Sequence, residues 1–164
     1  MLGIFTKQER VAYGTALEPI LLPKLKAILN NDIQKADYEF SFLDFKGKNC
    51  FAELKVRTED YHYTDPKIQS EGWIIPACKF IEANWSVSQG SDVYFFYLWV
   101  RDGSLWMFKY NPAFMNIFPL AVPEGHNENQ LHYYIAQEFW KKVDTLDITQ
   151  GFLKPRRCLI EDDD

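Results

Sequence analysis

Residues 37–57 carry the pattern from which the fold is predicted. They read Asp37-Tyr-Glu-Phe-Ser-Phe-Leu-Asp-Phe45, then Lys46-Gly47-Lys48-Asn49, then Cys50-Phe-Ala-Glu-Leu-Lys-Val-Arg57. The outer two segments alternate between polar and apolar residues with the period of a strand, and the segment between them has the composition of a turn. The sequence therefore predicts a β-hairpin over residues 37–57.

A helix is predicted before this hairpin. Thr6 and Glu9 have the spacing of a capping box, and apolar residues at helical spacing follow over about residues 7–29. Pro19 and Pro23 lie inside that range and lack the amide that a helix needs. We therefore expect either two helical pieces or one kinked helix.

After the hairpin, the pattern predicts helix, two strands and helix. Apolar residues at helical spacing indicate a helix over about residues 68–81 and a last one from about residue 127. Residues 92–100 are apolar on both faces, as in a central strand, and residues 104–110 are expected to pair back antiparallel with them. This order predicts an α/β fold in which helices flank a central mixed sheet.

Length and composition indicate one globular domain inside the cell. The 164 residues suit a single domain, predicted over residues 1–160, with an acidic tail at residues 161–164. That tail accounts for four of the net −5 charges, so the rest of the chain is nearly neutral and has no broad basic surface. The longest apolar run is too short to span a bilayer, and no signal-peptide pattern is found. The sequence thus predicts an intracellular protein without a membrane partner.

Three charged residues of the hairpin are the candidate catalytic group. On a strand over residues 50–57, Glu53 and Lys55 point to one face together with Phe51. Two charges on a face that otherwise buries its side chains are costly unless a partner or a metal compensates them. A hairpin with its turn at residues 46–49 brings Asp44 nearly opposite Glu53. Two carboxylates so close repel each other, which favours a bound Mg²⁺ or Mn²⁺ ion.

This arrangement resembles the PD-(D/E)xK nuclease superfamily. Asp44 followed by Glu53-Leu54-Lys55 matches its acid and (D/E)-x-K pattern on two successive strands. Gly14-Thr-Ala-Leu-Glu18 is similar to the G-x-x-x-E motif of the RecB-type exonuclease branch. Gln69-Ser-Glu-Gly-Trp73 is similar to its Q-x-x-x-Y motif, with Trp in place of Tyr. The matches cover roughly residues 10–110.

The resemblance implies a fold and a role for each matching residue. The fold is a restriction-endonuclease-like αβββαβ core, and the activity is metal-dependent hydrolysis of DNA phosphodiester bonds. Asp44 and Glu53 are then metal ligands, the Leu54 carbonyl is a third, Glu18 acts through water and Lys55 is the catalytic lysine. Gln69 and Trp73, one helical turn apart, are expected to line the DNA side of the site.

Nucleic acid is the expected partner. Lys46 and Lys48 at the hairpin tip, with Arg57 and Lys67, are the cations expected to contact the backbone of DNA or of RNA. Since few cations are available, stacking on Trp73 and on rings such as Tyr13 or Tyr61 is expected to favour strand ends, flaps or single strands. A setting in viral or mobile-element replication, repair or recombination is the expected context.

Other interpretations of the same residues remain open. A structure-selective endonuclease such as a junction resolvase has the same core and needs a homo-oligomer. A non-catalytic nucleic-acid-binding protein on this fold is the alternative from another class. For single residues, Glu53 and Lys55 also suit the solvated face of an edge strand, Asp44 suits a hairpin turn, and Trp73 suits the core.

Overall fold

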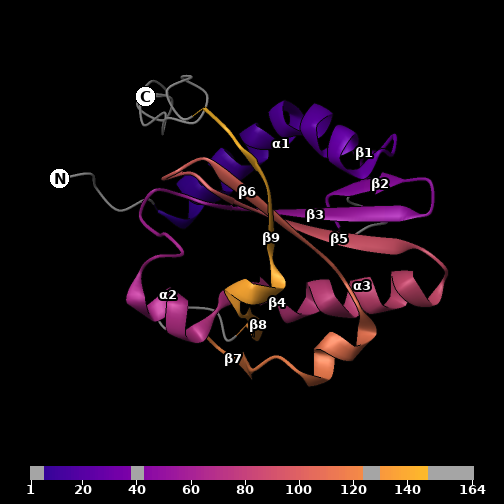
Figure 1. The fold of residues 1–164 in the computed structure, drawn as a ribbon. Helices are drawn as coiled ribbons and strands as arrows, with labels where there is room; N and C mark the ends of the chain where they lie inside the picture. Colours follow the sequence, from indigo (N-terminus) through magenta and orange to yellow (C-terminus); the bar gives the residue numbers. More distant parts are fainter. Residues whose placement is uncertain (1–5, 38–42, 124–129, 148–164) are drawn as a thin grey trace.

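The computed structural model describes residues 6–37, 43–123 and 130–147, which form a six-stranded mixed sheet and a smaller three-stranded sheet (Figure 1). The elements in chain order are α1 (Lys7–Leu29), β1 (Gln34–Lys35), β2 (Phe45–Gly47), β3 (Cys50–Arg57), α2 (Pro66–Glu71), β4 (Trp73–Pro76), α3 (Ala77–Ser88), β5 (Asp92–Trp99), β6 (Ser104–Lys109), the 3-10 helix η1 (Pro112–Asn116), β7 (Leu120–Ala121), β8 (His132–Ile135), the 3-10 helix η2 (Gln137–Phe139) and β9 (Lys141–Thr145). The large sheet has the order β1-β2-β3-β5-β6-β9 and the small one β4-β8-β7.

Helix α1 is a single helix that begins at the predicted capping box. The Thr6 hydroxyl accepts the amide of Glu9, and the Glu9 carboxylate accepts the amide of Thr6. Leu17, Leu21 and Leu25, spaced by four, are buried and form one continuous stripe against the sheet. This stripe holds the helix together across Pro19 and Pro23, which both lie on its exposed side. None of the helices in the described ranges is long and apolar enough to cross a membrane.

The predicted hairpin is present, with a tighter turn than expected. Phe45 pairs with Ala52 and Gly47 with Cys50, so only Lys48 and Asn49 make the turn. A side chain at Gly47 would collide with the Asn31 side-chain amide, which explains why the last residue of β2 is a glycine. Of the strand predicted over residues 37–45, residues 38–42 lie outside the described ranges, and β2 starts only at Phe45.

The mixed character of the sheet comes from the pairing of β3 with β5. These two strands run parallel over their whole length, from the Cys50–Asp92 pair to the Arg57–Trp99 pair. The chain crosses between them through α2, β4 and α3, as a parallel connection requires. All other pairs in the sheet are antiparallel, including the predicted β5–β6 pair. Strand β3 is therefore central, and the edge-strand interpretation of Glu53 and Lys55 is wrong.

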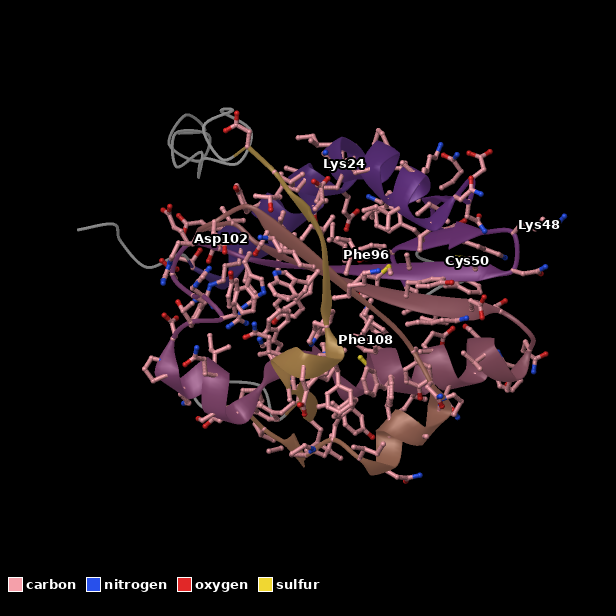
Figure 2. The ribbon with its side chains drawn as sticks, viewed as in Figure 1. Lys24, Lys48, Cys50, Phe96, Asp102 and Phe108 are labelled. Atoms are coloured by element: carbon pink, nitrogen blue, oxygen red, sulfur yellow. The ribbon has the colours of Figure 1, made fainter. Side chains whose placement is uncertain are left out.

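Two apolar clusters occupy the two faces of this sheet (Figures 1 and 2). Leu21 of α1 packs with Ala52, Leu54 and Phe96 on one face. On the other face Phe80 of α3 and other aromatic residues, Phe108 among them, form the second cluster. The alternation along β3 follows the prediction, because Phe51 packs against the α3 cluster while Cys50, Ala52, Leu54 and Val56 belong to the α1 cluster. Glu53 and Lys55, in phase with Phe51, face the α3 side.

The helix predicted over residues 68–81 is wrong, because a strand interrupts it. Helix α2 ends at Glu71, and the φ of 103° at its C-cap Gly72 lies outside helical geometry. Gly72 also lies against the Ile135 backbone, where a Cβ atom would come within 2.8 Å of the Ile135 carbonyl carbon. Residues 73–76 then pair with β8, and α3 begins only at Ala77. The apolar run at residues 73–75 fits the period of a helix as well as that of a strand, and pairing with β8 makes it a strand.

The last predicted helix, from about residue 127, is wrong as well. Residues 124–129 lie outside the described ranges, and β8, η2 and β9 occupy residues 132–145. Strand β8 completes the small sheet next to β4, and β9 is the edge of the large sheet next to β6. Lys141 and Lys142 therefore stand on an exposed edge strand, where lysines oppose pairing with another chain. The predicted tail at residues 161–164 lies outside the described residues.

Candidate active site

The predicted meeting of Asp44 and Glu53 is confirmed. Asp44 lies directly before β2, and its amide donates a hydrogen bond to Glu53 Oε2 at 3.1 Å. The Asp44 carboxylate in turn accepts the amide of Leu54 at 2.8 Å. Both acids are buried, with 8% and 9% of their surface exposed. Two carboxyl groups thus lie next to each other inside the protein.

Burial and proximity raise the pKa of both acids. For Glu53, burial is the largest cause and the charge of Asp44 the next, and together they raise its pKa to about 8. The pKa of Asp44 is also raised, first by burial and then by Glu18, although the hydrogen bond from Leu54 lowers it. The ionised form of both acids is therefore disfavoured in the folded protein, and a bound cation would compensate the charge that ionisation creates.

Lys55 follows on the same face of β3 and has the opposite shift. Burial lowers its pKa to about 8, and the positive charges of Arg57, Lys79 and Arg10 lower it further against the effect of Glu53. A lysine with such a pKa is a neutral amine in roughly a tenth of the molecules at pH 7 and in about half at pH 8, and in that form it can accept a proton from water.

Lys79 belongs to this group, although it is part of none of the predicted motifs. It lies in the first turn of α3, and its Nζ is 3.0 Å from Glu53 Oε1. Burial lowers the pKa of Lys79, but the Glu53 carboxylate outweighs this effect and the net shift is upward. One signal pointed to it, because Lys79 is the only charged residue in the apolar stretch from Gly72 to Ile81.

Glu18 is buried near Asp44 and has a lysine of its own. It lies within α1 with 8% of its surface exposed, and its carboxylate is 3.2 Å from Lys35 Nζ of β1. Its charge raises the pKa of Asp44, which shows that the two acids are close enough to interact. Helical geometry continues through Glu18 even though Pro19 follows it.

Gln69 and Trp73 do not form the predicted pair. Gln69 is exposed in α2, whereas Trp73 belongs to β4, with 1% of its surface exposed. The Trp73 ring stacks on Trp140 at 5.1 Å inside the aromatic cluster. The prediction that Trp73 stacks on DNA is therefore wrong, and its interpretation as a core residue is confirmed. The cause is strand β4, which begins at Trp73, so Gln69 and Trp73 do not lie on one helix.

The predicted cations do not gather around the carboxylates. Lys46 and Lys48 are exposed at the hairpin end of β3, and Arg57 is at its other end. With about 3.3 Å per strand residue, Lys48 and Arg57 are separated by about 30 Å of chain. Figure 2 shows Lys48 far from Asp102, which lies at the Arg57 end. Lys67 is exposed on α2.

Arg57 has neighbours from distant parts of the chain. The guanidinium carbons of Arg57 and Arg10 lie 4.3 and 5.5 Å from the centre of the Tyr61 ring. The two arginines come from β3 and α1, so the tertiary fold assembles this cluster. It lies on the Lys55 side of the site, because both arginines lower the pKa of Lys55.

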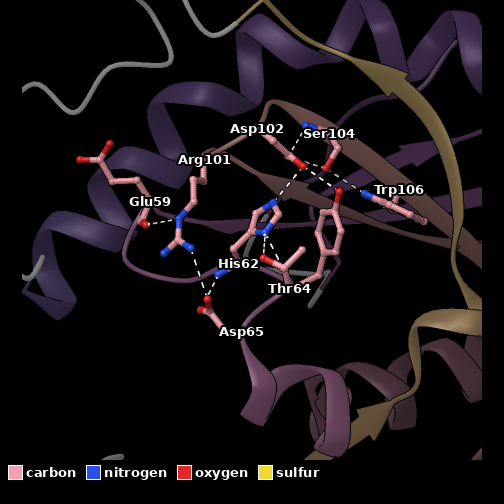
Figure 3. A network of polar contacts seen from close by, with 9 residues as sticks. Glu59, His62, Thr64, Asp65, Arg101, Asp102, Ser104 and Trp106 are labelled. Carbon is pink, nitrogen blue, oxygen red and sulfur yellow. Dashed lines mark hydrogen bonds and ion pairs between the residues drawn. The ribbon is translucent and has the colours of Figure 1, made fainter.

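A separate polar network fixes the loop that follows β3 (Figure 3). Asp102 accepts hydrogen bonds from Tyr63 and Ser104, and one of its oxygens lies 2.9 Å from His62 Nε2. His62 Nδ1 is 2.6 Å from the Thr64 hydroxyl. These bonds tie residues 62–64 to the β5–β6 turn, and thereby hold Tyr61 near the end of β3.

The carboxylate pair suits Mg²⁺ better than a metal that needs a full set of protein ligands. Among the residues that the structure describes, no group of three or more His, Cys, Asp or Glu side chains is positioned to hold a metal ion. Mg²⁺ is usually bound by one or two carboxylates, with water and substrate phosphate as the other ligands. Asp44 and Glu53 offer two such carboxylates. The Leu54 amide donates a hydrogen bond to the Asp44 carboxylate, and the role of the Leu54 carbonyl as a third metal ligand stays a prediction.

Comparison with known proteins adds no relative. No protein-family model, no curated protein and no solved structure matches the chain. A function is therefore inferred from the geometry of the site and from the resemblance of its motifs.

Proposed function

We propose that the protein is a Mg²⁺-dependent nuclease that hydrolyses DNA phosphodiester bonds at Asp44, Glu53 and Lys55. The observation that carries this proposal is the burial of two adjacent carboxylates beside a lysine whose pKa is lowered to about 8. Burying these charges costs stability, and an apolar strand face would not have this cost. Perturbed ionisable groups of this kind cluster at functional sites.

The element order supports a restriction-endonuclease-like core. Helix α1, the antiparallel strands β1, β2 and β3, the helical crossover and β5 parallel to β3 correspond to the αβββαβ order of that core. The family's acid and its (D/E)-x-K motif lie on two successive strands. Here Asp44 directly precedes β2, and the next strand, β3, contains Glu53 and Lys55.

The residues of the site have distinct roles in this proposal. Asp44 and Glu53 hold Mg²⁺ or Mn²⁺, which supplies positive charge to the phosphoryl group and makes water more acidic. Lys55, as neutral amine, takes the proton of the attacking water. The water oxygen forms a new bond to phosphorus, the bond from phosphorus to the leaving sugar oxygen breaks, and that oxygen takes a proton from a solvent water. Glu18 acts indirectly, through its charge near Asp44.

Arg57, Arg10 and Tyr61 provide the substrate contacts nearest to Lys55. Arginine recognises phosphate oxygens, and an aromatic ring stacks on a base when the base is unpaired. This small cluster favours strand ends, flaps or single strands over continuous duplex, because the nearly neutral chain offers no extended basic surface. Lys46, Lys48 and Lys67 are proposed as peripheral contacts.

Cleavage of labelled oligonucleotides tests the function. We expect single strands and flaps to be cut in Mg²⁺ or Mn²⁺, EDTA to stop the reaction, and excess Mg²⁺ to restore it. Asp44→Asn and Glu53→Gln should each lower the rate by at least ~10²-fold. Asp92→Asn, a change of an exposed acid at the start of β5, is the matched control and should keep full activity.

The other outcomes separate the alternatives. Binding of oligonucleotides without cleavage, equal with and without EDTA, would contradict the nuclease proposal and establish a binding protein. Cleavage confined to four-way junctions, by a dimer, would instead indicate a resolvase.

A further inference from the structure

We propose that Lys79 is a built-in cation that occupies the Glu53 carboxyl group when no divalent ion is bound and must leave it before such an ion can bind. This inference rests on the proposed function, since it concerns the same carboxylate pair. It identifies a residue that controls loading of the site and that no sequence motif includes.

Both oxygens of Glu53 have partners in the structure. Oε1 is 3.0 Å from Lys79 Nζ, and Oε2 accepts the amide of Asp44. A Mg²⁺ ion lies only ~2.1 Å from the oxygen that binds it. An ion on Glu53 Oε1 would therefore be in direct contact range of the Lys79 ammonium, and the two positive charges would repel each other. The ion and Lys79 compete for the same carboxylate.

The position of Lys79 on its helix favours this role over a structural one. Lys79 is the third residue of α3, and a positive charge in the first turn opposes the helix dipole. The helix dipole of α3 thus disfavours a lysine at this position. Its side chain reaches from α3 across to β3, where the Glu53 carboxylate lies.

Lys79 is also able to move away. Its side chain is 23% exposed, whereas that of Glu53 is 11% exposed. Four methylene groups allow the ammonium to swing toward solvent without a change in the backbone. The carboxylate is held in place by the Asp44 amide, so displacement changes the cation and leaves the ligand where it is.

Mn²⁺ binding measured by calorimetry tests the competition. We expect Lys79→Met to bind Mn²⁺ at least ~10-fold more tightly than the natural protein, because a like charge close to the ion is removed. The matched control is Lys24→Met, which removes a lysine paired at the same 3.0 Å distance with Asp144 instead. Its affinity should stay within ~3-fold of the natural protein, since neither Lys24 nor Asp144 belongs to the site in this proposal. Lys79→Gln serves as a second variant if Lys79→Met does not fold.

A measurement on the natural protein gives an independent readout. In protein labelled at the lysine Cε positions, one NMR signal, assigned by its loss in Lys79→Arg, should shift toward the position of an exposed lysine on addition of Mg²⁺. The Asp44→Asn protein should show no such shift at the same Mg²⁺ concentration.

The outcomes are distinguishable. If natural protein binds Mn²⁺ in an Asp44-dependent way but Lys79→Met binds it no more tightly, the inference is wrong and the proposed function stands. Equal tightening in Lys24→Met would also overturn the inference, because the effect would then be one of general charge. If no form of the protein binds Mn²⁺, both the proposed function and the inference fail.

Discussion

The Asp44 amide donates to the Glu53 carboxylate, and the Asp44 carboxylate accepts the amide of Leu54, the residue after Glu53. These two bonds connect the entry of β2 to the middle of β3 and replace the ladder pairing that the two strands lack at this point. They also fix the relative position of the two carboxyl groups. The same contacts that extend the hairpin therefore create the candidate metal ligands.

Removal of the Lys55 amine should abolish turnover without loss of the fold. We expect Lys55→Met to lower the cleavage rate by at least ~10²-fold, the scale of a lost general base. Because burial lowers the pKa of Lys55 to about 8, its charged form is disfavoured in the folded state, and the variant should melt at the same or a higher temperature at pH 7. Lys141→Met on the exposed edge strand β9 is the control. Full activity of folded Lys55→Met would contradict the assigned role.

The stability of the protein should depend on pH through Glu53. Its pKa is raised from 4.5 to about 8 on folding, so the folded protein keeps a proton that the unfolded chain loses. The resulting stabilisation is complete below about pH 4.5 and is lost as the pH rises through about 8. The Glu53→Gln variant has no carboxyl group at this position and does not lose this stabilisation. Its free energy of unfolding minus that of the natural protein should therefore increase by a few kcal/mol from pH 5 to pH 8. Urea unfolding at several pH values measures the difference, and a constant difference would contradict the raised pKa.

Metal binding should release a proton. Because a carboxylate must be ionised to bind Mg²⁺ or Mn²⁺, the raised pKa of Glu53 makes the affinity rise with pH. We expect an increase of up to ~10-fold per pH unit between pH 6 and 8, the slope for one proton. Calorimetry in two buffers with different ionisation enthalpies counts the protons directly. Release of none at pH 6.5 would show that Glu53 is already ionised or is not a ligand.

Binding of nucleic acid should depend only moderately on salt and should involve Arg57. We expect inactive Glu53→Gln to bind single strands and flaps more tightly than blunt duplex, with a slope of log affinity against log salt no steeper than about −4. Arg57→Ala should reduce that slope by ~0.7 to 0.9, the share of one phosphate contact. Lys141→Ala should leave it unchanged. A slope near −8 with preference for blunt duplex would reveal an extended basic surface and contradict the proposed substrate.

Local signals in the sequence were enough for the elements that contain the candidate site. The capping box starts α1, the alternation along residues 50–57 gives β3 its two faces, and the apolar run at 92–99 becomes the central strand β5. Each of these signals lies within a few residues of the structure it determines. The same holds for Asp44 and Glu53, which a short hairpin brings together whatever the rest of the chain does.

The tertiary structure alone decided the elements and contacts that depend on distant partners. Residues 73–76 and 132–135 are strands because they pair with each other, and residues 141–145 are a strand because β6 offers an edge. Their apolar patterns fit a helix equally well, so no local reading distinguishes the two. In the same way, Lys79 reaches Glu53 and Arg10 reaches Tyr61 only through the packing of α3 and α1 on the sheet. These strands and contacts depend on packing against residues far along the chain, and this packing outweighs the local preference of the sequence.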